Sequence, residues 1–202
     1  MTLDMDDLIN SILASVGRID FIKGSEIPDI DLYMDQVTTF MESRLSPSTR
    51  NPGVDKIMTK TMINNYAKNN LLPPPVKKKY TKEHLFVLVF IYYFKNVLSI
   101  SDINAVLKPI LDNYFGGNEE DGSVEYVYES IRKVAVELND SIQQDLMEKF
   151  KLSEGIFDGP DKEMLNEFSF ITLLCMDIYV KKLIIEKMID GFENKKKGQD
   201  DK

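Results

Sequence analysis

The residues best suited to chemistry are Asn and Lys side chains in a short polar segment, residues 59–69. Asn can form two hydrogen bonds with adenine, and Lys can reach guanine acceptors or phosphate oxygens. The segment is therefore a candidate DNA-reading helix, and base contacts are predicted for Lys60, Thr61, Asn64 and Asn65. The alternative is a solvated helix face, the usual environment of such residues.

A group of basic side chains follows this helix. The prolines at 73–75 cannot continue a helix and stiffen the chain, and three consecutive lysines come directly after them. Exposed lysines on a loop can pair with phosphates whatever the base sequence. Phosphate contacts are predicted for Lys68, Lys77, Lys78, Lys79 and Lys82. For the lysine triplet taken alone, a solvated turn is an equally good interpretation.

Charge is distributed unevenly along the chain. From Arg44 to Lys95 there are ten Lys and Arg against two acidic residues, a net charge of +8, although the whole chain carries −8. The remaining residues therefore sum to −16. Separation on this scale favours a face that binds a polyanion, despite a sequence pI of about 4.8.

The apolar spacing predicts a chain that is nearly all helix. Helices are expected over residues 3–16, 29–45, 59–69, 81–98, 100–114, 123–152 and 162–192. The helix after Thr81 is apolar around almost its whole circumference, which predicts a central, buried position. Residues 76–80 are expected to form one arm of a small hairpin, and Pro109 is expected to kink or break its helix.

These elements suggest five segments. They are an N-terminal helix and turn (1–28), a DNA-binding head (29–115), an acidic linker (116–122), a helical dimerisation or sensing region (123–192) and a disordered tail (193–202). The last long helix carries more apolar residues than one bundle readily covers. This predicts a homodimer, with a monomeric core as the alternative.

Other classes of site find little support in the sequence. One Cys and one His leave too few ligands for a structural zinc site. The chain has no Gly-rich phosphate loop and no nucleophile elbow, so we expect no enzyme activity, no cofactor and no metal. Cys175 is expected to be an inert core thiol, and His84 to be solvated or half-buried. The acidic start and the short apolar runs predict a cytoplasmic protein without a membrane span.

Part of the chain resembles the MerR family of winged-helix transcription regulators. The similar residues are Tyr66, the run Asn70-Leu-Leu-Pro73, the pair Lys78-x-Tyr80, and Leu98-Ser-Ile-Ser-Asp-Ile103. The resemblance covers about residues 56–107 and implies a DNA-binding head with a small β-hairpin wing. Asn64 stands where that family has an Arg, and Asn cannot grip a phosphate as a charged fork does.

The chain as a whole resembles an uncharacterised bacterial family, domain of unknown function 1836. The shared runs are Ile-Asn-Asn-Tyr, Lys-Lys-Tyr and Ile-Tyr-Tyr. The expected fold is all-α: a MerR-like winged helix-turn-helix with a small β-hairpin wing, plus a helical bundle in the C-terminal half. The expected function is a transcription regulator that binds double-stranded DNA, with operator and effector unknown. The alternative is a protein-binding adaptor that uses the helix-turn-helix only as a scaffold.

Overall fold

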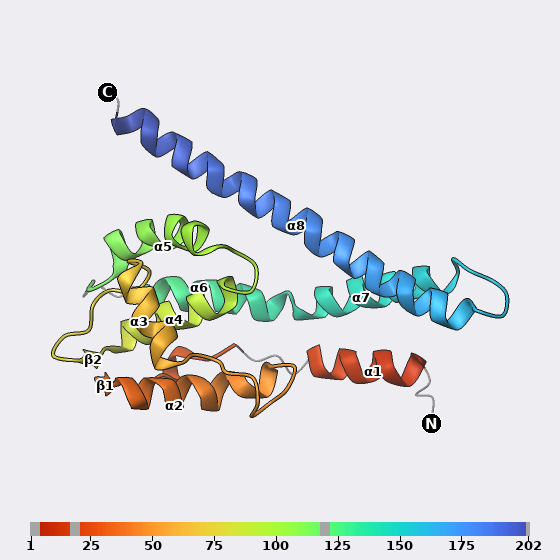
Figure 1. Cartoon of the computed structure of the whole chain (residues 1–202), viewed down its shortest axis with the longest axis horizontal. Helices are drawn as coiled ribbons and strands as arrows, with labels where there is room; N and C mark the ends of the chain where they lie inside the picture. Colours follow the sequence, from red (N-terminus) through yellow and green to blue (C-terminus); the bar gives the residue numbers. More distant parts are fainter. Residues whose placement is uncertain (1–4, 17–20, 118–121, 201–202) are drawn as a thin grey trace. The chain divides into compact units, whose positions relative to one another are not determined.

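The computed structural model describes residues 5–16, 21–117 and 122–200, and this part of the chain is mostly helical (Figure 1). The long helices are α1 (Met5–Val16), α2 (Met34–Leu45), α3 (Lys60–Lys68), α4 (Lys82–Phe94), α5 (Ile100–Tyr114), α6 (Val124–Glu137), α7 (Asn139–Glu154) and α8 (Lys162–Asp200). Two short 3-10 helices, Gly24–Glu26 and Ser46–Ser48, and the strands β1 (Leu32–Tyr33) and β2 (Lys79–Tyr80) complete the described elements. Within the described residues, none of the helices is both long and apolar enough to cross a membrane.

The chain divides into two compact units. The head comprises Ile22–Arg132 together with Ile189–Lys202, and the arm comprises Met1–Phe21 together with Lys133–Met188. The head holds every residue predicted to touch DNA.

Helix α4 forms the centre of the head. Every residue from His84 to Tyr92 is buried, and these side chains pack with residues of α2, α3, α5 and α6. The predicted central position is therefore confirmed. The helix ends at Phe94, earlier than the predicted Leu98, and in the turn that follows the carbonyl of Phe94 accepts the N–H groups of Val97 and Leu98.

The small sheet joins segments that are far apart in sequence. β1 pairs with β2 in antiparallel register, with Leu32 opposite Tyr80 and Tyr33 opposite Lys79. Residues 29–45 were predicted as one helix, but α2 begins at Met34. The Tyr33 N–H donates to Gln36 Oε1 at 2.9 Å, which caps the first turn and lets the preceding residues extend as a strand.

Helix α5 begins as predicted. Ser99 Oγ accepts the Asp102 N–H at 3.2 Å, and the Ser99 N–H donates to Asp102 Oδ2 at 3.2 Å, a capping box. The helix is not broken at Pro109 and continues to Tyr114.

The helix predicted over residues 123–152 is two helices, α6 and α7, which meet at Leu138. The first half of α6 belongs to the head core. Tyr128 Oη donates to the Ile22 carbonyl at 2.6 Å, and its ring lies 5.0 Å from Phe86 and 5.5 Å from Phe90. The head therefore extends beyond the linker predicted at 116–122.

The arm has a small interior. Ile9 of α1, Phe150 of α7 and Phe170 of α8 are buried together, with Leu13, Met147 and Leu174 packed against them. Cys175 was predicted to lie in a core, and this was wrong, because its side chain is exposed. α8 also continues past Phe192, the predicted end, to Asp200.

Candidate nucleic-acid interface

Helix α3 has well-defined ends. At its start, Thr59 Oγ1 accepts the Met62 N–H at 3.2 Å and so caps the first turn. At its end Asn70 has a φ of 57°, the left-handed conformation that commonly closes helices. The Leu71 N–H donates to the Tyr66 carbonyl at 2.9 Å, so α3 closes with a Schellman motif.

One face of α3 is fixed in the head core. Ile63 and Tyr66 are buried there, and burial raises the pKa of the Tyr66 hydroxyl. The opposite face is solvent-exposed, and it carries Lys60, Thr61, Asn64, Asn65 and Lys68. The structure thus brings together on one surface all the residues predicted to contact bases.

Two of these side chains already have partners. The Lys60 ammonium pairs with Asp35 of α2, and Asn65 Oδ1 accepts a hydrogen bond from Asn69 Nδ2 at 3.2 Å. In the described part of the chain, no side-chain hydrogen bond or ion pair involves Thr61, Asn64 or Lys68. These three residues are therefore the most available for an external ligand.

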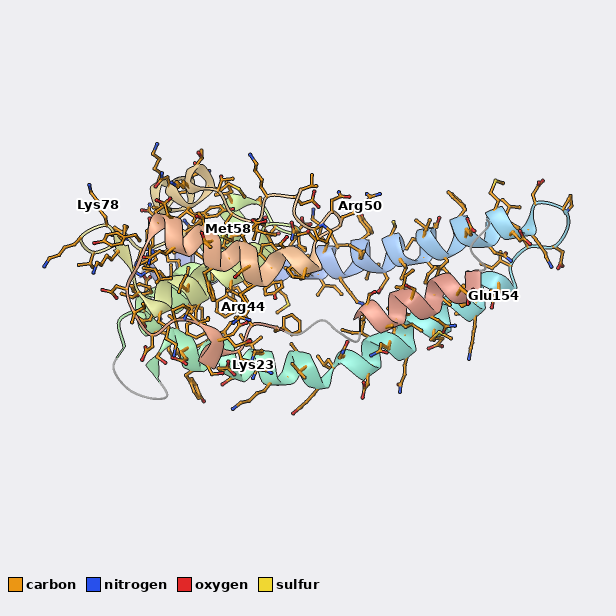
Figure 2. The ribbon with its side chains drawn as sticks, turned by 90° about the horizontal axis from the view of Figure 1, so that it is seen from below. Lys23, Arg44, Arg50, Met58, Lys78 and Glu154 are labelled. Carbon is orange, nitrogen blue, oxygen red and sulfur yellow. The ribbon has the colours of Figure 1, made fainter. Side chains whose placement is uncertain are left out.

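Residues 76–80 were predicted to form one arm of a hairpin, but they contain a complete tight turn, with Lys77 and Lys78 at its centre. Val76 and Lys79 exchange two backbone hydrogen bonds, of 3.1 and 2.9 Å, across Lys77 and Lys78. Lys77 and Lys78 have φ values of 50° and 65°, which define a type I′ turn. Both side chains are exposed, and Lys78 projects away from the helices in Figure 2. We call residues 76–80 the wing.

Lys79 and Lys82, which were also predicted to contact phosphates, already have partners within the head. The Lys79 ammonium lies 5.3 Å from the centre of the Tyr33 ring. Lys82 pairs with Glu125 of α6 at 2.8 Å and is largely shielded from solvent. A role for Lys82 in phosphate binding stays a prediction that requires this ion pair to open. Sequence reasoning missed Tyr33, because its exposure beside the wing depends on the pairing of β1 with β2.

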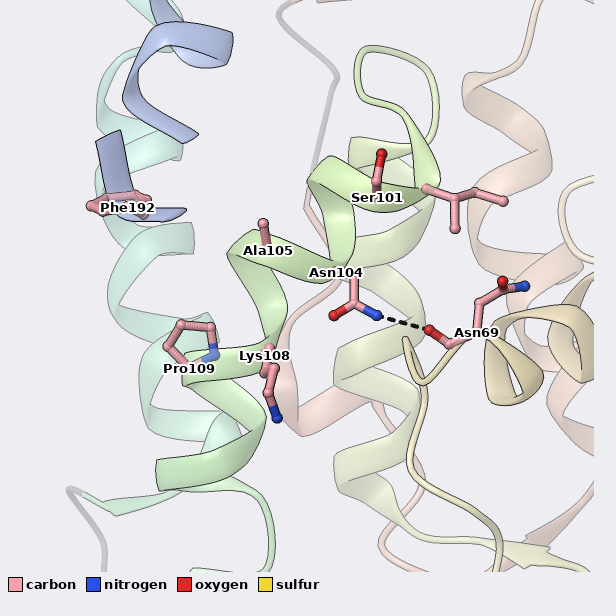
Figure 3. A pocket seen from close by; sticks show the side chains of 8 residues that line it. Asn69, Ser101, Asn104, Ala105, Lys108, Pro109 and Phe192 are labelled. Atoms are coloured by element: carbon pink, nitrogen blue, oxygen red, sulfur yellow. Dashed lines mark hydrogen bonds between the residues drawn. The ribbon is translucent and has the colours of Figure 1, made fainter. Parts of the chain in front are cut away.

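Two long-range hydrogen bonds hold the ends of α3. Lys95 Nζ donates to the Ile57 carbonyl, just before the helix, at 2.7 Å, and burial lowers the pKa of this ammonium. Asn104 Nδ2 of α5 donates to the carbonyl of the C-cap residue Asn69 at 2.8 Å (Figure 3). Neither contact has a local sequence signal, because the partners lie 38 and 35 residues apart.

His84 connects the wing to the start of α4. Its Nδ1 accepts the Thr81 N–H at 3.0 Å, and its ring lies 5.5 Å from that of Tyr80 and 4.9 Å from that of Phe115. The prediction of a solvated or half-buried ring was wrong, since His84 is 1% exposed. Burial lowers its pKa, although the carbonyls of Pro73 and Pro74 and the charge of Asp31 oppose this.

A shallow hollow lies beside the end of α3. A hollow of about 510 Å³ beside the Asn104–Asn69 contact is lined by Asn69, Ile100, Ser101, Asn104, Ala105, Lys108, Pro109 and Phe192 (Figure 3). Among the described residues, no group of three or more His, Cys, Asp or Glu is placed to hold a metal ion.

The path between α2 and α3 is long. The two helices contact each other, but the chain between them runs from Ser46 to Thr59. A compact helix-turn-helix uses about three or four residues for this connection. Its tight turn is therefore missing from the described head. Burial of Ile63 and Tyr66 holds α3, together with the hydrogen bonds of Lys95 and Asn104.

A sequence family matches the first and larger segment of the head. Residues 22–131 match the family described as "Domain of unknown function (DUF1836)". The chain belongs to the DUF1836 family. No curated protein matches the chain, and no solved structure matches it. The DUF1836 region begins at the first residue of the head and ends beside Arg132, so the whole arm and the second segment of the head, Ile189–Lys202, lie outside it.

Proposed function

We propose that the DUF1836 head binds double-stranded DNA and that the protein is a transcription regulator. Its α3 and wing would act as a MerR-like DNA-binding helix and wing. In this proposal α3 enters the major groove and the wing contacts the adjacent phosphates. Support comes from the exposed polar face of α3 and from the lysines of the wing, which belong to the same compact unit.

The observation that carries the proposal is the choice of residues at the wing tip. The two central positions of a type I′ turn strongly favour Asn and Gly, because both require positive φ. Here both positions are Lys, at φ values of 50° and 65°. A left-handed residue with a side chain costs roughly 1 kcal/mol. Backbone strain of this kind is typical of functional positions, and here its effect is to place two charges at an exposed tip.

The side chains divide into two roles. Asn64 and Thr61 are proposed to meet base edges, with Lys60 joining them when its pairing with Asp35 opens. Lys68, Lys77 and Lys78 are proposed to meet phosphates, for which they are exposed and free of ion pairs among the described residues. Lys79 is held over Tyr33 and lies beside them.

The first test is a salt-dependent binding titration with the purified full chain and generic duplex DNA. If about five phosphates are neutralised, log K should fall with log[salt] at a slope of roughly −4 to −5. No detectable affinity at about 50 mM salt, where non-specific binding is ordinarily measurable, would contradict the proposal.

The second test exchanges the wing tip for the preferred turn sequence. Lys77→Asn with Lys78→Gly should stabilise the head by up to about 1 kcal/mol, because the strain is relieved. The same variant should flatten the salt dependence of DNA binding by a slope of about 2, because two phosphate contacts are removed. A thermal melt and a salt titration measure the two effects. If stability rises while the slope is unchanged, the wing does not contact phosphates.

A third test separates base contacts from phosphate contacts. Asn64→Ala should lower the preference for a selected site over scrambled duplex by about 1–3 kcal/mol. Lys78→Ala should weaken both duplexes by the same factor, because phosphates are alike along the duplex. A competition assay compares the two variants. A parallel loss of affinity with unchanged specificity would show that α3 does not contact base edges.

An adaptor function is the second candidate, and one observation favours it. Large apolar side chains of the wing and of the strand paired with it are exposed: Val76 of the wing at 65% and Tyr33 of β1 at 55%. Tyr33 and Val76 both lie against Lys79 through the strand pairing. Apolar side chains around a basic turn suit a protein partner with acidic and apolar groups. Retention of the chain on heparin and duplex DNA at low salt argues for DNA, and its absence argues for the adaptor.

A further inference from the structure

The head has a second hollow beside α5, which the proposed function does not use. Its volume is about 600 Å³, and all of its lining residues belong to the head. Every one of them is apolar, and those from α4, α5 and α6 include Phe90, Phe94, Leu107, Ile110, Val127 and Ile131. We call this space the apolar hollow.

The apolar hollow differs in chemistry from the hollow drawn in Figure 3. The two share Ala105, Pro109 and Phe192, but the hollow in Figure 3 is also lined by polar side chains, including Asn104 and Lys108. Helix α5 thus contributes to two neighbouring spaces, one with polar groups in its lining and one without them.

Aromatic rings form one wall of the apolar hollow, and part of its rim is open. The rings of Phe90 and Phe94 stack with their centres 5.9 Å apart and their planes 26° apart. Ile131 and Phe192 are exposed at 55% and 54%, so the hollow is accessible to solvent beside them. A small molecule therefore has a route to the rings.

The lining defines which molecules fit. A volume of this size lies within the usual range of small-molecule sites, roughly 300–1,000 Å³. A charged ligand is disfavoured, because its charge would lose hydration without gaining a polar partner. Flat phenyl walls favour an aromatic ring, which can stack on them or meet them edge to face. The chemistry of the lining therefore selects an uncharged aromatic molecule.

Pro109 adds one polar feature. Proline has no N–H, so the carbonyl of Ala105, four residues earlier in α5, lacks its usual helix partner. Both residues line the apolar hollow, where this carbonyl can accept a hydrogen bond from a ligand N–H or O–H. The missing bond also makes α5 easier to bend at this point, because proline loosens the turn before it.

We propose that the apolar hollow binds a small uncharged aromatic molecule with one hydrogen-bond donor, and that this molecule acts on the position of α3. The walls of the hollow carry the two long-range contacts that hold α3. Lys95, which bonds the Ile57 carbonyl at 2.7 Å, directly follows Phe94. Asn104, which bonds the Asn69 carbonyl at 2.8 Å, directly precedes Ala105.

The direction of the effect follows from the conformation that contains the hollow. A ligand shifts a protein toward the conformation that binds it best. In the conformation described here the hollow is formed and both contacts to α3 are made. A ligand that fills the hollow should therefore support α5 at Pro109 and hold the end of α3 more firmly. Only the consequence for DNA affinity rests on the proposed function.

The first experiment titrates the purified full chain with N-phenyl-α-naphthylamine, an uncharged aromatic dye with one N–H that fluoresces in apolar sites. Saturable binding is expected with a dissociation constant of about 1–100 μM. Ile131→Glu places a carboxylate at the rim and should raise this constant at least about tenfold.

Tyr126→Glu is the matched control, because Tyr126 is also an exposed residue of α6, at 45%, but does not line the hollow. It should change the constant less than about threefold. Thermal melts check that both variants stay folded. No saturable binding, or equal effects of the two substitutions, would overturn the site.

The second experiment measures amide hydrogen exchange by NMR, with and without saturating dye and without DNA. The Leu71 N–H, which closes α3 on the Tyr66 carbonyl, should exchange at least about threefold more slowly with dye bound. The Ser46 N–H, which closes α2 on the Glu42 carbonyl, is the control and should slow less.

Asn104→Ala tests the connection between the hollow and α3. This variant should bind the dye as the wild type does, because Asn104 does not line the apolar hollow. The slowing at Leu71 should be lost, because the contact to the Asn69 carbonyl is absent. Equal slowing at Leu71 and Ser46 in the wild type, or slowing at Leu71 that persists in Asn104→Ala, would overturn the action on α3.

Both experiments are independent of DNA binding. A chain that binds the dye as expected but has no affinity for duplex DNA would support the apolar hollow and contradict the DNA proposal. A chain that binds duplex DNA but not the dye would contradict the hollow as a ligand site and leave the DNA proposal intact.

Discussion

The head and the arm differ in how many of their apolar side chains they bury. In the head, α4 is surrounded on all sides, and every residue from His84 to Tyr92 is buried. In the described arm, the interior consists of Ile9, Phe150 and Phe170 with three partly buried neighbours. Both regions are rich in apolar residues, but the head places them inside and the arm leaves many on its surface.

The difference separates two uses of apolar sequence. A core of many buried side chains gives the head the means to fold by itself, and its surface features are then free to serve binding. The arm gains little from its own interior, and its apolar surface gains free energy when another surface covers it. The DUF1836 match covers residues 22–131 of the head and none of the arm, so the family boundary follows the same division.

The largest expected effect compares equal substitutions in the two regions. Leu88→Ala removes a fully buried side chain at the centre of α4 and should lower the unfolding free energy of the head by about 3–5 kcal/mol. Leu174→Ala removes a partly buried side chain of the arm and should cost about 1 kcal/mol. Urea denaturation with hydrogen exchange, which resolves the two units, measures both. Equal losses of unfolding free energy in the two variants would contradict this difference between the head and the arm.

An intermediate effect is expected from pH, and it should be confined to the head. Burial lowers the pKa of His84 below 6.5, so the folded head holds the ring neutral while the unfolded chain takes up the proton first. The stabilisation is present above about pH 6.5 and is lost as pH falls toward the folded pKa. The slope can reach about 1.4 kcal/mol per pH unit.

The control for this titration is His84→Asn, whose side-chain oxygen can still accept the Thr81 N–H but does not titrate. Melts between about pH 7 and 5.5 avoid most carboxylate titration. Wild type should lose stability over this range, and the variant should not. The same slope in both would assign the pH dependence to other groups.

The smallest expected effect concerns the position of α3. Asn104→Ala removes the hydrogen bond to the Asn69 carbonyl and should lower stability by about 1 kcal/mol. Hydrogen exchange should rise most at the end of α3, because that contact holds its C-cap. Asn113→Ala is the control, since Asn113 donates to the Pro109 carbonyl within α5. An equal rise in exchange within α3 for both variants would show that Asn104 does not hold the helix.

Local features of the fold could be predicted where the sequence carries a local signal. The cap at Thr59, the left-handed Asn70 and the box formed by Ser99 and Asp102 each depend on residues within a few positions. The burial of α4 follows from apolar residues around its whole circumference. The break at Leu138 and the unbroken α5 at Pro109 could not be predicted in this way, because helix preference of single residues is a weak guide on its own.

The sequence by itself determined that the described chain is mostly helical, that the basic residues concentrate in one region, and which residues form the polar face of α3. The tertiary structure alone decided which of these groups are available. It paired Lys60 with Asp35 and Lys82 with Glu125, placed Tyr33 under Lys79, and buried His84 while exposing Cys175. The physical reason is the distance along the chain over which each interaction acts. Helix periodicity and capping act within about four residues, whereas ion pairs and burial depend on which distant segments meet.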